Sequence, residues 1–352
     1  VKQGRLQARD AITAQIVSVQ FTAFSRFSIA ESYEGVPCLQ HSLYRMDLIL
    51  EPLDKYVFSP YVYPANLLET DPVRQFISFW LITTFGGGLM VLIPDAINYF
   101  FFFDHNLMKH KRFLPNQVRK EIMYTLWSIP YMAIPTAMMF VLENQGYSKL
   151  YENVSDHAWG WWYIVMTLPC FLFFTDMCIY WIHRWLHHPL IYGPIHKDHH
   201  QWVICTPFAS HAFHPIDGFL QSFPYHLYAF LFPLHKTFYL ILFIAVNFWT
   251  VSIHDEIYMV PNFLKPFING SAHHTDHHTD FNYNYGQYFT LWDRIGGSFK
   301  EPSGHIPGAS VYDQLARQLK GIEEEDPLHG IDPVDRDEYI KKNGLQAKVS
   351  TK

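Results

Sequence analysis

The residues most able to do chemistry in this chain are histidines, and ten of the 21 lie in two clusters. Of the 21 histidines, 15 fall between positions 183 and 278. The first cluster runs from His183 to His200 and the second from His273 to His278. Within each cluster histidines recur at i+3 or i+4, which places them on one face of a helix. Imidazole nitrogen is a ligand for Zn, Cu, Fe and Ni, so this spacing predicts a metal centre.

The number of histidines favours two metal ions over one. The two-histidine helical motif of zinc enzymes needs only one more ligand, whereas this chain offers roughly ten. Adjacent histidines point about 100° apart on a helix, so one helix end can serve both ions. We predict that the ligands are His183, His187, His188, His196, His199, His200, His254, His274, His277 and His278. Three more histidines are additional candidates: His273, His211 and His214.

Three carboxylates are expected to accept hydrogen bonds from the ligand histidines. Asp176 lies on the helical stripe that continues through Tyr180 to His183 and His187. Such a carboxylate fixes the tautomer and the orientation of a ligand ring. The alternative is that Asp176 ends a helix and faces lipid headgroups. The same role as a hydrogen-bond acceptor is assigned to two residues inside the clusters, Asp198 and Asp276.

Long apolar stretches predict that the chain crosses a membrane several times. Residues 76–94, 122–142 and 158–175 are uncharged, and each is 18 to 21 residues long. This is the length that a helix needs to cross a bilayer. Residues 218–234 and 237–253 are shorter and form a hairpin that need not cross completely. We therefore expect an all-α, multi-pass membrane protein with about four transmembrane helices and a cytosolic cap of histidine-rich helices.

The distribution of charge predicts on which side the histidines lie. The loop after the first apolar stretch is basic, and basic loops stay in the cytosol; its cationic residues are Lys109, Lys111, Arg112, Arg119 and Lys120. The loop after the second stretch is mainly acidic and contains a glycosylation sequon at Asn153, both compatible with the lumen. Counting the crossings from there brings both histidine clusters to the cytosolic face.

The sequence divides into three parts. Residues 1–45 precede Met46, which resembles a natural start, and are expected to be a dispensable or non-native extension. Residues 46–299 are the predicted membrane-embedded metal-binding domain, and residues 300–352 are a polar cytosolic tail. The net charge of -6 argues against nucleic acid as a partner. The four cysteines form no CxxC pair, so no disulfide framework is expected.

An all-histidine centre at a membrane surface favours oxidation chemistry. Soluble di-iron proteins of the four-helix type use Glu and Glu-x-x-His ligands, and the chain has no such pair. Two iron ions at an all-nitrogen site would activate O2 and abstract hydrogen from an unactivated C–H bond. No motif for a bound haem, flavin or iron–sulfur cluster is present, so a separate electron donor is expected on the cytosolic face. A polyhistidine zinc-binding or transport protein is the non-enzymatic alternative.

Several motifs in the chain resemble those of a known family. The patterns HxxxH at 183–187 and HxxHH at 196–200 and 274–278 resemble the three histidine boxes of the membrane fatty acid hydroxylase superfamily. Three further stretches are similar to the sterol C-5 desaturases of the lathosterol oxidase type: residues 206–215, 232–236 and 281–294. The resemblance covers most of the chain from about residue 46 to residue 299. Asp198 stands where the family pattern is expected to have proline, and His273 is an added histidine that can share or replace a ligand.

The resemblance implies a di-iron oxidoreductase of the endoplasmic reticulum membrane. It would introduce a C5–C6 double bond into a delta-7 sterol, with O2 as co-substrate and electrons from NAD(P)H through cytochrome b5 and its reductase. Ergosterol synthesis would be the setting in a fungus. The alternatives within the superfamily are sterol C-4 methyl oxidation and lipid hydroxylation. These share the histidine boxes, but we expect them to lack residues 281–294 as written here.

Overall fold

The computed structural model describes residues 48–302 except residue 262, so the predicted extension (1–45) and most of the predicted tail (300–352) lie outside the described residues. Within the described part, helices dominate, and the strands are two residues long. The strands β1 (Leu150–Tyr151) and β2 (Leu234–His235) form a parallel pair with Leu150 opposite Leu234. The prediction of an all-α protein is confirmed.

Four helical segments are long and apolar enough to cross a membrane. The first is continuous from Pro72 to Phe101 and consists of α4 (Pro72–Leu81), the π-helical turn η2 (Ile82–Gly86) and α5 (Gly87–Phe101). The others are α6 (Gln117–Asn144), α7 (Trp161–Leu186) and α11 (Lys236–Ile253). The predicted stretches 76–94, 122–142, 158–175 and 237–253 overlap these four segments, which confirms about four spans.

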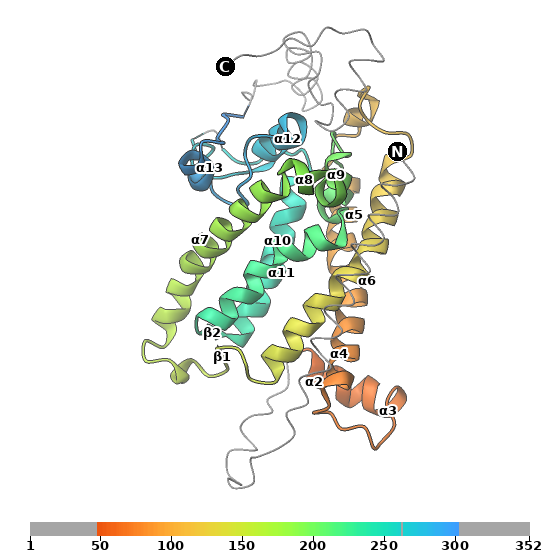
Figure 1. Ribbon diagram of the computed structural model, residues 1–352, viewed down its shortest axis with the longest axis vertical. Helices are drawn as coiled ribbons and strands as arrows, with labels where there is room; N and C mark the ends of the chain where they lie inside the picture. The colour runs from red at the N-terminus through yellow and green to blue at the C-terminus, as the bar shows by residue number, and fades with distance from the viewer. Residues whose placement is uncertain (1–47, 262, 303–352) are drawn as a thin grey trace. The chain divides into compact units, whose positions relative to one another are not determined.

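The hairpin of α10 (Pro215–Leu231) and α11 runs between the same two ends of the bundle as the other long helices (Figure 1). Its turn is fixed to the loop after α6, because the backbone N–H of Lys149 donates to the Ala229 carbonyl at 2.8 Å and Lys149 Nζ donates to the Leu231 carbonyl at 2.8 Å. We refer to the end of the bundle at which β1 and β2 pair as the strand end. With 17 residues, α10 is at the lower limit for a crossing helix.

Exposed tryptophans on α7 mark the two edges of an apolar band. Trp161 and Trp162 are 72% and 75% exposed at the start of the helix, and Trp181 and Trp185 are 51% and 52% exposed near its end. From Trp162 to Trp181, 19 residues rise about 29 Å, close to the ~30 Å thickness of the hydrocarbon core of a bilayer. Tryptophan favours the two membrane–water interfaces, so we expect His183, which follows Trp181, at the boundary of the membrane.

Short helical elements lie at the two ends of the bundle. At the strand end, α2 (Leu50–Leu53), η1 (Asp54–Phe58) and α3 (Ser59–Tyr61) precede α4, and the buried pair Arg74–Asp54, 3.0 Å apart, connects them to it. η4 (Val154–Asp156) lies in the loop before α7. The opposite end, which we call the histidine end, is capped by η3 (His105–Lys109), α8 (Pro189–Ile191), η5 (Tyr192–His196), α9 (Lys197–His200), η6 (Pro207–His211), α12 (Ser271–Asp280) and α13 (Leu291–Gly296) (Figure 1).

Candidate metal centre

The structure brings nine histidines together in two groups at the histidine end. One nitrogen from each member lies within 4.8 Å of one nitrogen from every other member of its group. The first group contains His183, His187, His196, His200 and His277, and the second contains His199, His254, His274 and His278. Segments separated by almost a hundred residues therefore converge on two adjacent points. The cluster is almost entirely shielded from solvent, since only His187 is more than about a tenth exposed.

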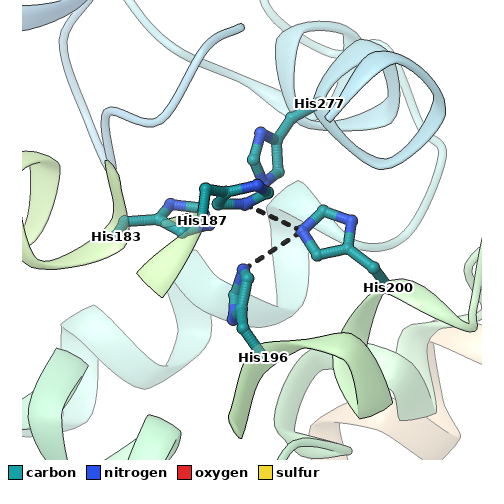
Figure 2. Close-up of side chains that lie close together, drawn as sticks. All are labelled: His183, His187, His196, His200 and His277. Atoms are coloured by element: carbon teal, nitrogen blue, oxygen red, sulfur yellow. Dashed lines mark hydrogen bonds between the residues drawn. The ribbon is translucent and has the colours of Figure 1, made fainter. Parts of the chain in front are cut away.

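The five histidines of the first group come from four helical elements (Figure 2). His183 lies in the last turn of α7 and His187 caps that helix; His196 ends η5, and His200 ends α9. His200 Nε2 is 3.1 Å from His187 Nε2 and 3.1 Å from His196 Nε2. His277, from α12, completes the group. Aromatic rings that do not belong to the group close it on one side, with Tyr285 centred 5.0 Å from His187 and Phe281 centred 5.0 Å from His200.

The four histidines of the second group come from α9, the C-cap of α11, and α12. His274 and His278 are i and i+4 on α12, and their Nε2 atoms are 3.1 Å apart. His274 Nε2 is also 2.9 Å from His254 Nε2, which in turn is 3.4 Å from His199 Nε2. The i, i+4 spacing in the sequence thus produces the predicted shared face.

Oxygen acceptors behind four of the nine rings fix which nitrogen points into the group. The Nδ1 atoms of these rings lie 2.7 to 3.0 Å from an oxygen that can only accept, so each Nδ1 carries the proton and each Nε2 is left as a lone-pair donor. The acceptors are the Tyr285 carbonyl for His183, Asp217 Oδ2 for His196, the Thr250 carbonyl for His254 and the Tyr283 carbonyl for His277.

The nitrogen atoms left over by this arrangement fit a metal ion. Within the described residues, the Nε2 atoms of His183 and His277 are buried and have no hydrogen-bond partner. A buried polar atom without a partner is costly in a folded protein. Coordination to a cation would remove that cost, and neutral imidazole is the form that coordinates. The first group therefore has the donor chemistry of a metal site.

The three predicted carboxylate acceptors each have a partner outside the two groups, and for Asp176 this corrects the assignment. Asp176 Oδ1 accepts from the backbone N–H of Gln287 at 3.0 Å and of Tyr288 at 2.7 Å, because it lies two turns before His183 and faces a loop. Asp198 Oδ2 accepts from the Tyr124 hydroxyl at 2.6 Å. Asp276 lies 3.6 Å from Lys300 Nζ.

Asp217 has the role that the sequence assigned to those three. It lies in the first turn of α10, is fully buried, and contacts His196 Nδ1 at 2.7 Å. Its other oxygen accepts from Gln221 Nε2 at 2.7 Å. The signal available in the sequence was its place immediately before the apolar stretch 218–234, where an ionisable residue at the end of a membrane segment suggests a function.

His188 does not join either group, which corrects its assignment as a ligand. Its side chain is exposed, and its Nδ1 accepts from the backbone N–H of Leu190 at 3.4 Å. α7 ends at Leu186, and the backbone of His188 is extended as the N-cap of α8. The ring therefore points away from the metal groups.

The three additional candidates also lie outside the two groups. His211 is hydrogen-bonded to Ser210 at 2.9 Å and to Asn247 at 3.1 Å. His214 caps α10 by accepting from the backbone N–H of Ile216 at 3.3 Å, and His273 accepts from the N–H of Gly270 at 3.4 Å at the start of α12. His214 and His273 each accept a backbone N–H bond at a helix start, in the way an N-cap side chain does.

Burial keeps the clustered histidines neutral. It lowers the pKa of His199, His200, His274, His277 and His278 well below the usual value, and the neighbouring imidazoles lower it further. Burial also lowers the pKa of His254, to about 4. At neutral pH these rings are therefore uncharged and able to bind a cation.

This lowered pKa predicts how pH affects the stability of the metal-free protein. In the unfolded chain His278 takes up a proton near pH 6.5, whereas the buried ring does not, so the folded state loses stability as pH falls through 6.5. His278→Asn should reduce the dependence of the unfolding free energy on pH by up to about 1.4 kcal/mol per unit below pH 6.5. Thermal unfolding in detergent from pH 7.5 to 5.5 tests this. The exposed His188→Asn serves as control, and an unchanged slope in His278→Asn would contradict the prediction.

A cavity of about 150 Å³, which we call the proximal cavity, reaches the centre from inside the helix bundle. One end is lined by His183 of the first group and by His199, His254 and His274 of the second. The other end is formed by apolar side chains of α5, α6 and α11 such as Val91, Ile129 and Val246. The cavity thus joins both histidine groups to apolar side chains inside the bundle.

Comparison with known proteins identifies relatives of the chain. The protein-family model described as fatty acid hydroxylase matches residues 168–298. A lathosterol oxidase of Rattus norvegicus is 59% identical over 282 residues, which cover 79% of this chain and 94% of the relative. The lathosterol oxidase of Homo sapiens is 59% identical over 258 residues, covering 73% of this chain and 86% of the relative.

Fungal proteins are similar over the same region. A delta(7)-sterol 5(6)-desaturase of Eremothecium gossypii is 46% identical over 283 residues, which cover 78% of this chain and 80% of the relative. No solved structure matches the chain at a significant level.

Proposed function

The chain belongs to the fatty acid hydroxylase family, with lathosterol oxidases and delta(7)-sterol 5(6)-desaturases as its relatives, and we propose that it is a sterol C-5 desaturase. The reaction introduces a C5–C6 double bond into a delta-7 sterol. One observation carries the proposal: nine histidines converge at the end of an apolar cavity between membrane-crossing helices. An apolar substrate that resides in the bilayer can reach such a site directly.

The metals of the proposed enzyme are two iron ions, one in each histidine group. Imidazole binds iron as well as zinc, copper and nickel, so the choice of iron rests on the oxidation chemistry of the family. When bound, the irons supply the reductive activation of O2 that hydrogen removal from an unactivated C–H bond requires. His183, His187, His196, His200 and His277 hold one ion, and His199, His254, His274 and His278 hold the other.

The other residues of the site orient the ligands and keep water out. The carbonyls of Tyr283 and Tyr285 and the carboxylate of Asp217 hold the Nδ1 protons, so the Nε2 atoms stay directed at the ions. The rings of Tyr285 and Phe281 lie against the first group and limit the access of water to it. Exclusion of water matters because a reactive oxidant would otherwise react with it.

The electron donor docks at the histidine end of the bundle. Cytochrome b5 and its reductase, fed by NAD(P)H, are the donors proposed from the family resemblance. The basic loop between α5 and α6 lies at this end, since Leu107 packs against Ile204, which immediately follows the first histidine cluster. Because basic loops remain in the cytosol, we place the histidine end on the cytosolic face of the endoplasmic reticulum membrane.

Sterol profiling in a host that lacks its own C-5 desaturase tests the proposed reaction. Expression of this chain should convert accumulated delta-7 sterols into delta-5,7 sterols. Delta-7 sterols left unchanged, with inserted and iron-loaded protein present, would contradict the proposal. Oxidised 4-methyl groups or hydroxylated lipids would identify one of the other reactions of the superfamily. Bound zinc without any oxidised product would identify a zinc-binding protein.

A further inference from the structure

A second and larger cavity adjoins the proximal cavity. This distal cavity has a volume of about 590 Å³ and lies toward the strand end, between η1, η2, α6 and α11. Four residues line both cavities, and they form the boundary between the two: Thr83, Gly87, Met90 and Phe243. The two cavities therefore lie next to each other, and both are lined by residues of α11.

The glycine run in the first membrane segment leaves this space open. A Cβ atom at Gly86 would meet no heavy atom within 4 Å, and one at Gly87 would meet only Thr83 Cγ2 at 4.0 Å. The preceding turn, η2, is π-helical, a local widening that occurs often at functional sites. Both glycines line the distal cavity, and the absence of side chains there leaves room for a ligand.

The polarity of the lining changes along the two cavities. Near the histidines the proximal cavity contains polar groups, among them Gln287, whose Nε2 donates to Thr250 Oγ1 at 3.2 Å. The distal cavity is lined mainly by apolar side chains such as Phe79, Leu240 and Ile244. Two of its polar residues are bonded to each other: the Tyr239 hydroxyl lies 3.2 Å from Glu143 Oε1, and it also lies 2.7 Å from His226 Nδ1.

A sterol matches this change of polarity in one orientation. The C5–C6 bond lies next to the ring that carries the hydroxyl, and the aliphatic side chain is attached at the opposite end of the fused rings. If C5 and C6 face the metals, the hydroxyl stays near the polar groups, and the side chain points along α11. Phe243 precedes His254 by 11 residues, which is about 16 Å along the helix, the scale of the sterol ring system with part of its side chain.

We propose that the distal cavity holds the aliphatic side chain of the sterol and selects among sterols that differ there. The inference rests on the proposed C-5 desaturase function and adds the orientation of the substrate to it. Leu240, Ile244 and Phe243 then determine which side chains are accepted. The same orientation lets a sterol of the cytosolic leaflet enter with its hydroxyl still at the membrane surface.

A pair of tryptophan variants tests the role of the distal cavity. Leu240 lines it, whereas the next residue, Ile241, is 53% exposed on the outside of α11. Leu240→Trp should lower kcat/KM for a delta-7 sterol with a full side chain by about tenfold or more, since one surplus methylene in an apolar pocket changes kcat/KM roughly 10- to 200-fold. A delta-7 sterol without a side chain should be affected by less than about twofold, and Ile241→Trp should leave both unchanged. An unchanged kcat/KM for the full-length sterol in Leu240→Trp overturns the proposal.

A second variant and a labelling experiment test the proposal even if Leu240→Trp fails to insert into the membrane. Leu240→Ala should raise the turnover of a sterol with a bulkier side chain relative to the ordinary one, and an unchanged ratio overturns the proposal. A sterol with a photoreactive group at the end of its side chain should label α11 near residues 240–244. Labelling confined to residues 247–254 would also overturn the proposal. So would labelling of residues 240–244 by a photoreactive diacyl lipid that added sterol does not displace. Conversion of the full-length sterol by the unchanged protein tests the desaturase function separately.

Discussion

Replacement of His277 by alanine should abolish sterol desaturation while leaving the protein inserted in the membrane. His277 is the member of the five-histidine group contributed by α12, and its Nδ1 is 2.7 Å from the Tyr283 carbonyl, so its Nε2 is directed into the group. Its loss would remove one of the five proposed ligands of this group and leave the site incomplete. Turnover should fall by roughly 10³-fold or more, as it does when one member of a catalytic unit is removed. Bound iron should fall as well.

The measurement combines sterol profiling with metal analysis of the purified protein. His188→Ala is the matched control, because His188 neighbours the same cluster but is exposed and points away from it. The control should retain both iron and turnover. Normal turnover in His277→Ala would show that this group does not hold a metal needed for the reaction.

The membrane-spanning helices and the residues that share one helix face could be predicted from the sequence. Helical spacing placed His274 and His278 on one face of α12, and the apolar stretch that ends at Ile253 placed His254 at the same end of the bundle. These inferences depend only on helix periodicity and on the length of a membrane crossing. Both properties hold whatever the surrounding packing, which is why the predicted spans and the convergence of the histidines agree with the structure.

The contacts that orient the ligands could not be predicted because they arise from irregular backbone. After α12 the chain turns through Phe281 and Asn284, with φ values of 63° and 55°, a region that non-glycine residues rarely adopt. The carbonyls of Tyr283 and Tyr285 lie within this turn and reach His277 and His183. No periodicity in the sequence signals such a turn.

The residues at which helices end were equally hard to predict from the sequence. One residue decides whether a histidine points toward the centre or away from it, since successive side chains on a helix differ by about 100°. His187 caps α7 and joins the first group. The backbone of His188 is extended at the N-cap of α8, and His188 does not join the group. Asp176 was assigned to a histidine because it shares the stripe of His183, but a loop far along the chain provides the N–H groups that it accepts.

Replacement of Asp217 by asparagine should weaken metal binding by about 10- to 100-fold, as the loss of an outer hydrogen-bond partner does in other metal sites. The carboxylate contacts His196 Nδ1 at 2.7 Å, and both side chains are fully buried. Asparagine has nearly the same shape but carries no charge, and it can present its amide N–H to the ring. His196 could then hold its proton on Nε2, which would remove the lone pair that the first group needs.

A comparison of Asp217→Asn with a matched variant distinguishes a loss of metal binding from a general loss of stability. Iron retained against a competing chelator should fall in Asp217→Asn, while Asp198→Asn should retain iron within about threefold, because the Asp198 carboxylate bonds to the Tyr124 hydroxyl. A thermal unfolding midpoint of the metal-free protein should be taken for both variants. If Asp217→Asn retains iron as the unchanged protein does, the tautomer of His196 is not set by Asp217, and the five-histidine group must be oriented by its backbone acceptors alone.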